Sequence, residues 1–169
     1  MGTGYHGGFG ATRGSAYKMS SSDSSVPVIT KVIRKQDIID ALMGVTEMST
    51  AVAKSIAAKQ IGINILGDKL FESTLDLNKV KDPKGVNGYQ DGVQTYIRRS
   101  AVKGFSVFLH EGVHAYEFLN RIPQAEISSR KGERRAYWHE HEYQVKKGEH
   151  IEYKDLDEII VHINLNYDP

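Results

Sequence analysis

One segment in the second half of the chain constrains the fold more than any other. Residues 105–119 are mostly apolar, yet a His-Glu-Gly-Val-His motif lies at their centre, at residues 110–114. Histidines four residues apart lie on one face of a helix, so both imidazoles can reach the same metal ion. A helix that fixes this geometry must be buried and rigid. The sequence therefore predicts a core helix over about residues 101–120, capped by Ser100 and ended before Pro123.

Each polar residue of the motif has a chemical role in this interpretation. His110 and His114 are the candidate metal ligands. Glu111 lies beside them and projects toward the same cavity, where its carboxylate can hold and deprotonate a metal-bound water. A purely structural zinc site has no use for that carboxylate, so Glu111 favours catalysis. The alternative is that both histidines are ordinary surface or core residues of a helix.

A catalytic zinc ion usually has three protein ligands and a water, so two histidines leave one position to fill. The next predicted helix, over about residues 132–147, carries Glu133 in its first turn. Ala136 is small and lies on the same face, which would let the two helices approach closely. Glu140 and Glu126 are the alternative ligands. Glu133 could instead be a solvated charge that the helix dipole favours.

Hydrolysis of an amide also requires a hydrogen-bond donor for the charge that develops on the carbonyl oxygen. The candidate oxyanion donors are Tyr137, His141 and Tyr143, and the sequence does not choose among them. Three other histidines lie outside any ligand pattern and are interpreted as structural or exposed: His6, His150 and His162.

Two segments carry a resemblance to a known family. Residues 108–115, Phe-Leu-His-Glu-Gly-Val-His-Ala, resemble the active-site helix of the zincin metallopeptidases. Residues 133–137, Glu-Arg-Arg-Ala-Tyr, are similar to the second helix of the gluzincin branch, which supplies the glutamate ligand. The resemblance covers roughly residues 45–147, in which the order of elements is also similar. The metzincin extension is absent, because Glu117 and Asn120 stand where it requires glycine and histidine.

This resemblance implies a zinc metallopeptidase that binds one Zn²⁺ and acts on a peptide or protein substrate. Glu111 would be the general base and then the proton donor to the leaving amine. The small size is similar to that of the minimal zincin domains of secreted bacterial toxins, which implies an immunity or inhibitor protein as a further partner. Two alternatives remain open: a metal-dependent amidase that acts on a cell-wall or other non-protein substrate, and a catalytically inactive, zinc-stabilised binding domain.

The first 25 residues differ in composition from the rest. Residues 1–25 are rich in glycine and serine and contain no Val, Ile or Leu, so they have little to bury against the entropy of ordering. We interpret them as a flexible arm or linker, which would suit a module attached to a longer delivery protein. Residues 26–169 are then a single domain, zincin-like by the resemblance.

Composition excludes several functions. The chain of 169 residues has a formal net charge of +1, which gives no electrostatic argument for binding nucleic acid. It has no cysteine, which excludes disulfides, a cysteine nucleophile and thiolate zinc ligands. No apolar run reaches the roughly 18 residues that span a bilayer. The N-terminus lacks the apolar core of a signal peptide. The sequence leaves the localisation open, and the one expectation is secretion as part of a larger protein.

The remaining periodicities predict an α+β fold, with a small mixed sheet, the motif helix and a ligand-bearing helix after it. The strand at residues 93–98 alternates apolar and polar side chains, and we expect it to be the edge that binds an extended peptide. The other expected elements are a strand at 28–33, a helical region at 35–61 with Thr46 as an N-cap and Gly62 as a stop, strands at 63–66 and 69–71, a turn at Asn87-Gly88 and a helix at 156–165.

Overall fold

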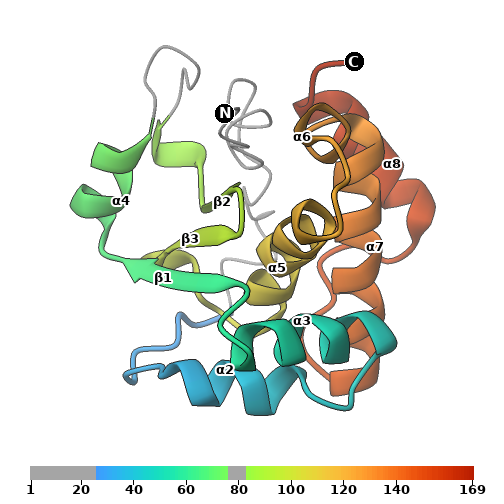
Figure 1. Cartoon of the computed structure of the whole chain (residues 1–169). Coiled ribbons are helices and arrows are strands. Elements are labelled where there is room, and N and C mark those ends of the chain that lie inside the picture. Colours follow the sequence, from blue (N-terminus) through green and yellow to red (C-terminus); the bar gives the residue numbers. More distant parts are fainter. Residues whose placement is uncertain (1–25, 76–82) are drawn as a thin grey trace.

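A computed structural model describes residues 26–75 and 83–169, so the glycine- and serine-rich segment 1–25 lies outside the described residues (Figure 1). The fold is α+β, as predicted. The main elements in chain order are α2 (Lys35–Leu42), α3 (Glu47–Ala57), β1 (Gly62–Leu66), α4 (Asp68–Thr74), β2 (Gly88–Asp91), β3 (Gln94–Arg98), α5 (Ser106–Leu119), α6 (Gln124–Ile127), α7 (Arg130–Lys147) and α8 (Leu156–Asn166).

The described strands form one mixed sheet in the order β1-β3-β2. β1 runs parallel to β3, and β2 runs antiparallel to it. The strand predicted at residues 93–98 therefore exists, but its prediction as the edge is wrong, because β3 lies in the middle. The turn between β2 and β3 includes Gly92, whose φ of +61° suits glycine. The predicted Asn87-Gly88 turn is also wrong, since Gly88 is the first residue of β2.

Two predicted strands are absent. Residues 28–33 have no regular structure, although the Ile29 N–H donates to the Val102 carbonyl at 2.7 Å. Residues 69–71 lie in helix α4, where Phe71 is buried together with Leu75, one turn further on. That helical pairing outweighs the local β preference of an apolar pair.

The predicted helical region at residues 35–61 is two helices. The chain turns between them at Gly44, which has a φ of +76°. Thr46 is the N-cap of α3, as predicted, and its side chain accepts a hydrogen bond from the Ser49 N–H at 2.9 Å. α3 ends at Ala57, so the helix stops before Gly62, which instead begins β1.

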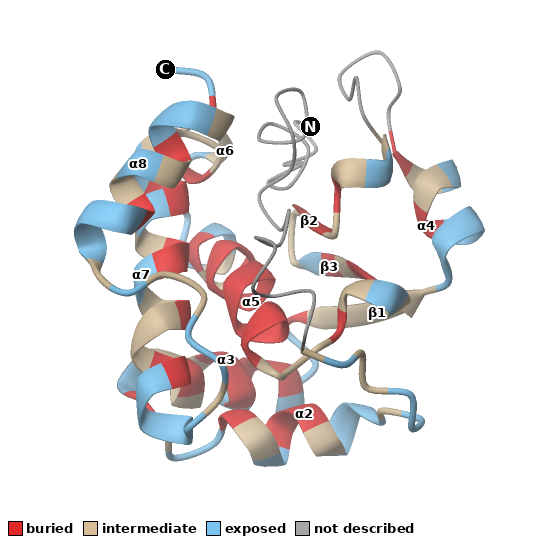
Figure 2. Ribbon diagram, turned by 180° about the vertical axis from the view of Figure 1, so that it is seen from behind, coloured by how far each residue is buried: buried red, intermediate tan, exposed pale blue. Residues whose placement is uncertain are grey.

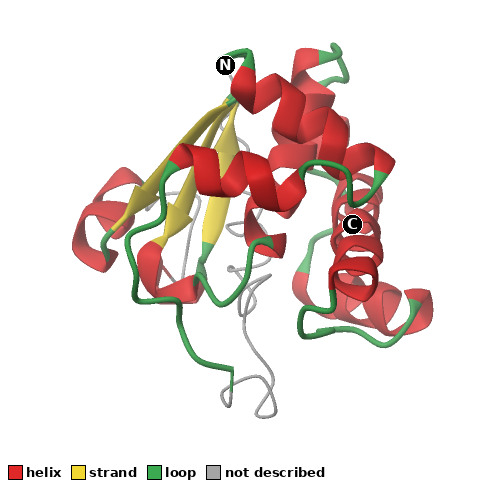
Figure 3. Cartoon of the chain, turned by 90° about the horizontal axis from the view of Figure 1, so that it is seen from below, coloured by secondary structure: helices red, strands yellow, loops and turns green. Residues whose placement is uncertain are grey.

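α5 is the central element of the fold. Figure 2 shows it buried along most of its length, between the sheet and α7, and Figure 3 shows the strands together on one side of the molecule. It begins at Ser106 rather than at residue 101, because residues 99–101 form a short 3-10 turn. Its first N–H groups, those of Phe105 and Ser106, donate to the Glu149 carboxylate at 3.1 and 3.2 Å, so Ser100 is not its cap.

Close contacts fix α5 among its neighbours. A Cβ atom added at Gly112 would lie 2.6 Å from Cγ1 of Val52, so glycine lets α3 approach the motif helix. α7 packs along α5 from the other side and α8 packs against α7. α8 covers the predicted range, with Asp155 as its N-cap. None of the described helices is long and apolar enough to cross a membrane.

Candidate metal centre

Three side chains from α5 and α7 converge at one point. His110, His114 and Glu133 each offer one ligand atom, and these atoms lie within 4.8 Å of one another. Oε2 of Glu133 is 3.3 Å from Nε2 of His110 and 3.5 Å from Nε2 of His114. All three side chains are fully buried. The group could hold a metal ion, and it consists of the three residues that the sequence predicts as ligands.

The local structure explains why Glu133 reaches the histidines. α7 begins at Arg130, two residues earlier than predicted, with Ser129 as its N-cap. A Cβ at Gly132 would lie 2.0 Å from the Ile127 carbonyl oxygen, so glycine permits the tight corner between α6 and α7. Ala136 is fully buried on the face toward α5. The sharp corner and the small residue bring the first turn of α7 against the motif helix.

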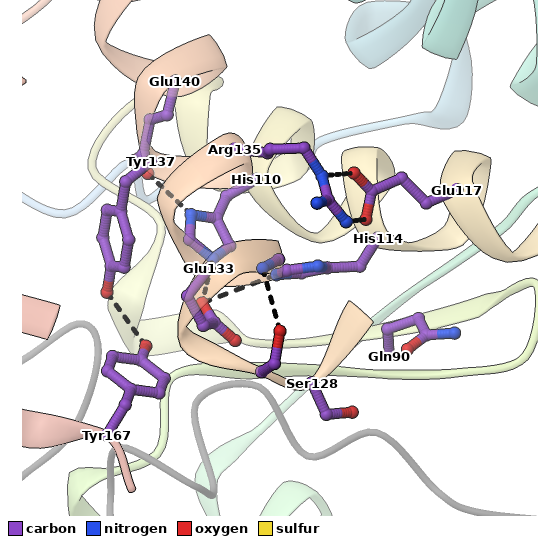
Figure 4. A network of polar contacts seen from close by, with 12 residues as sticks. Gln90, His110, His114, Glu117, Ser128, Glu133, Arg135, Tyr137, Glu140 and Tyr167 are labelled. Atoms are coloured by element: carbon purple, nitrogen blue, oxygen red, sulfur yellow. Dashed lines mark hydrogen bonds and ion pairs between the residues drawn. The ribbon is translucent and has the colours of Figure 1, made fainter. Parts of the chain in front are cut away.

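Glu140 has a different position from Glu133. Its Oε2 accepts a hydrogen bond from Nδ1 of His110 at 2.9 Å, and Gln144 donates to its other oxygen at 3.4 Å. A carboxylate on Nδ1 fixes the ring orientation and leaves Nε2 for a metal (Figure 4). Glu140 therefore orients a ligand in this arrangement. Glu126 lies apart from the cluster, at the surface, where it pairs with Arg135 and Lys131.

The carboxylates of Glu133 and Glu140 dominate the electrostatics at His110. Burial lowers the pKa of His110, but hydrogen bonds to Glu133 and Glu140 outweigh that effect and raise the pKa to about 10. Two carboxylates on one buried imidazole thus create a site that favours a positive charge. A proton can supply that charge, and so can a metal cation held between His110, His114 and Glu133.

Glu111 lies on the sheet side of the cluster. It is fully buried, and a Cβ at Gly88 would lie 2.7 Å from its Oε1. Glycine at this position of β2 therefore leaves the room that the carboxylate occupies. The neighbouring Gln90 ties β2 to α6, because Gln124 donates to its side-chain oxygen at 3.0 Å. The Glu111 side chain is therefore enclosed between the motif helix and β2.

An ion pair between Arg135 and Glu117, neither of which is a candidate ligand, also joins α7 to α5. Arg135 donates to both carboxylate oxygens of Glu117, which is buried, and Nη2 lies 3.2 Å from Oε2 (Figure 4). Such a two-bond pairing of guanidinium and carboxylate fixes orientation as well as distance. Glu117 lies three residues after His114 in α5. The ion pair therefore holds the part of α5 that carries His114 against α7.

The three candidate oxyanion donors occupy different places. The Tyr137 ring lies edge-on to the His110 ring, with centroids 4.5 Å apart. His141 stacks on Trp138, with centroids 5.4 Å apart. Tyr143 donates to the Ala41 carbonyl in α2 at 3.0 Å, and burial raises the pKa of its hydroxyl. Tyr137 thus has a ring contact with a candidate metal ligand, His110.

A further tyrosine, which the sequence does not point to, contacts Tyr137. Tyr167 follows α8, is almost fully buried, and its hydroxyl lies 3.2 Å from that of Tyr137 (Figure 4). Burial raises the pKa of Tyr167, and the negative charges of Glu133 and Glu111 raise it further. Through its hydrogen bond to Tyr137, it is joined to the side chain whose ring contacts His110. No spacing pattern in the sequence singles out this residue.

Comparison with known proteins assigns no family to this chain. No protein-family model, curated protein or solved structure matches it at a significant level. The chemistry of the site rests on three buried candidate ligands, on the further buried carboxylate of Glu111, and on the Glu140 carboxylate that orients one imidazole.

Proposed function

We propose that this protein is a zinc-dependent peptidase of the zincin type. The observation that carries the proposal is the convergence of His110, His114 and Glu133 within 4.8 Å, beside the buried carboxylate of Glu111. Two imidazoles and one carboxylate are a known ligand set of catalytic zinc sites. Their distribution over α5 and α7, which the short helix α6 separates in the sequence, agrees with what the resemblance to the gluzincin branch implies.

Zinc, when bound, supplies a Lewis acid that polarises the scissile carbonyl and acidifies the attacking water. Glu111 accepts the proton of that water and later transfers it to the leaving amine nitrogen, so one carboxylate serves both steps. Its full burial keeps the proton transfer away from bulk water. Glu140 holds the His110 ring in the orientation that directs Nε2 toward Glu133.

Tyr137 and Tyr167, whose hydroxyls lie 3.2 Å apart, are the candidate donors for the negative charge that develops on the carbonyl oxygen. They are chosen because the Tyr137 ring contacts the His110 ring, with centroids 4.5 Å apart. Tyr143 cannot serve this role in the observed conformation, because its hydroxyl donates to α2. A donor that is positioned before the reaction stabilises the transition state without the cost of reorganisation.

The position of β2 indicates where a peptide would bind. β2 is an edge strand of the described sheet, and its Gly88 adjoins Glu111. An extended peptide could add to this edge by backbone hydrogen bonds, with its scissile bond near the carboxylate.

The proposal is tested first by metal content. Purified protein is expected to bind close to one zinc per chain by native mass spectrometry or elemental analysis. A His110→Ala, His114→Ala double variant should lose that zinc. A Glu126→Gln variant is a matched control, because Glu126 is a carboxylate of the same region outside the cluster. Wild-type protein that takes up no metal after reconstitution would exclude the zinc site.

Activity is tested by digestion of a peptide library and of a denatured protein. The wild type should cleave peptide bonds, whereas Glu111→Gln should retain zinc and lose about 10²–10⁴-fold in rate, because glutamine cannot accept the proton. Near-wild-type turnover by Glu111→Gln would contradict the mechanism. Zinc binding without peptide cleavage, but with cleavage of cell-wall amides, would assign the site to an amidase instead. Delivery as a toxin module stays a prediction.

A further inference from the structure

A cavity of about 160 Å³ lies next to Glu140, the residue whose carboxylate orients His110. Its lining comes from α7, from the start of α5 and from the connection between α7 and α8, and it includes Gln144, Ser106 and Glu149. A carboxylate beside such a space can turn into it by a change of rotamer. The 2.9 Å contact between Oε2 of Glu140 and Nδ1 of His110 therefore depends on what holds the other carboxylate oxygen.

Gln144, one turn after Glu140 in α7, contacts that other oxygen. Its Nε2 donates to Oε1 of Glu140 at 3.4 Å and to Oγ of Ser106 at 3.1 Å. Its Oε1 accepts from the backbone N–H of Glu152 at 3.4 Å. The Gln144 side chain is buried, so little water competes for these hydrogen bonds. Because residues four apart adjoin on a helix, α7 itself brings the amide and the carboxylate together.

The orientation of the Gln144 amide follows from the chemistry of its partners. A backbone N–H can only donate, so the amide oxygen must face Glu152. The amide nitrogen then faces Glu140 and Ser106, to which it donates. The reverse orientation would set the amide oxygen against the Glu140 carboxylate and the amide hydrogens against the N–H of Glu152. This direction holds whatever further contacts Glu140 and Glu152 make, because it depends on donor and acceptor types alone.

The backbone of Gln144 anchors the connection that follows α7. The N–H groups of Gly148 and Glu149 donate to its carbonyl oxygen at 3.0 and 3.1 Å. The carboxylate of Glu149 in turn accepts from the N–H groups of Phe105 and Ser106, at the start of α5. Gln144 thus lies where the end of α7, the connection to α8 and the start of α5 meet. Its amide therefore has little freedom to turn away from the carboxylate.

We propose that Gln144 is a positioning residue of the metal centre, whose amide holds the Glu140 carboxylate against His110. The inference rests on the proposed function, in which His110 is a zinc ligand. One carboxylate oxygen binds the amide and the other binds Nδ1 of His110, which leaves Nε2 for the metal. Carboxylates that orient a ligating imidazole contribute to metal affinity. Gln144 consequently contributes to zinc affinity through Glu140, and not as a ligand.

The role of Gln144 is tested by zinc affinity, measured by competition with a chromophoric chelator. Gln144→Met nearly keeps the length and volume of the side chain but removes the donor. It should weaken zinc binding by about threefold to tenfold, as the loss of one hydrogen bond does. The same substitution in a Glu140→Ala background should change the affinity by less than about twofold, because the group on which Gln144 acts is gone. An equal loss in both backgrounds, or no loss in either, would overturn the proposal.

Two further variants separate this role from a structural one. Tyr143→Phe removes the hydroxyl of the neighbouring buried residue of α7, which donates to the Ala41 carbonyl. It should lower the melting temperature at an unchanged zinc affinity. Ser106→Ala removes one partner of the Gln144 amide, and it should weaken zinc binding less than Gln144→Met does. If Gln144→Met does not fold, Ser106→Ala decides the question, because a wild-type affinity in that variant would overturn the proposal.

The measurement also distinguishes this proposal from the proposed function. A wild type that binds zinc but cleaves no peptide would contradict the peptidase function, while the affinities of the variants would still decide the role of Gln144. A peptidase in which Gln144→Met binds zinc as tightly as the wild type would overturn the role of Gln144 alone. A wild type that binds no zinc would overturn both.

Discussion

Two groups of side chains at the candidate metal centre, named here the ligand wall and the aromatic wall, are built in different ways. On the ligand wall, α5 and α7 are long helices that an Arg135–Glu117 pair and a Glu140–His110 bond hold together. In the aromatic wall, the rings of Tyr137, His162 and Tyr167 come from α7, α8 and the residue after α8. The ligand wall depends on charge pairing between regular elements, whereas the aromatic wall depends on where the chain end docks.

This difference indicates that the two groups of side chains have different roles. Charged groups that converge on a buried point create a cation site, and regular helices can hold them at a fixed spacing. Neutral hydroxyl groups act through direction, which their partners set. We therefore expect damage to the ligand wall to change metal binding, and damage to the aromatic wall to change the rate at an unchanged metal content.

The largest expected effect comes from removal of the third ligand. Glu133→Ala should lose both zinc and activity, because two histidines alone leave the ion with too few protein ligands. Dialysis against a zinc buffer, followed by elemental analysis, measures the occupancy. Full zinc occupancy in Glu133→Ala would require another ligand, and Glu140, which already contacts His110, would be the first to test.

A smaller effect on the same wall is expected from Glu140→Gln. The amide keeps the size of the side chain but weakens the bond that orients His110. Partners of this kind contribute about 10–100-fold to metal affinity. Competition with a chromophoric zinc chelator measures the change against wild type. An affinity equal to that of wild type would mean that helix packing alone orients the ring.

The smallest effect is expected from a change at Arg130, which holds the last residues of α8 and Tyr167. Arg130 donates to the backbone carbonyls of Tyr167 and Asn164, at 2.9 and 3.2 Å. Arg130→Met should lower the free energy of unfolding by about 1 kcal/mol, since these bonds are partly exposed. Urea unfolding measures the stability, and elemental analysis should show unchanged zinc. Loss of zinc from this variant would contradict the separation of the two walls.

Several elements could be predicted from local patterns. The α+β class, the Thr46 cap, α7 and α8 follow from periodicity and capping preferences, which act over a few residues. The errors share a cause. Phe71 lies in a helix because it packs together with Leu75, and β3 is central because β1 and β2 pair on both its sides. Such contacts join distant segments, and the local sequence does not report them.

The same distinction holds at the site. The sequence by itself determined that His110 and His114 share one helix face, because that spacing depends only on the helix repeat. It also indicated Glu133, which the structure places within 3.5 Å of both histidines. Only the tertiary structure decided that Glu140 orients His110 and that Tyr167 bonds Tyr137, whose ring contacts His110. Those roles depend on how α7 and the chain end pack against α5, and no local repeat encodes that packing.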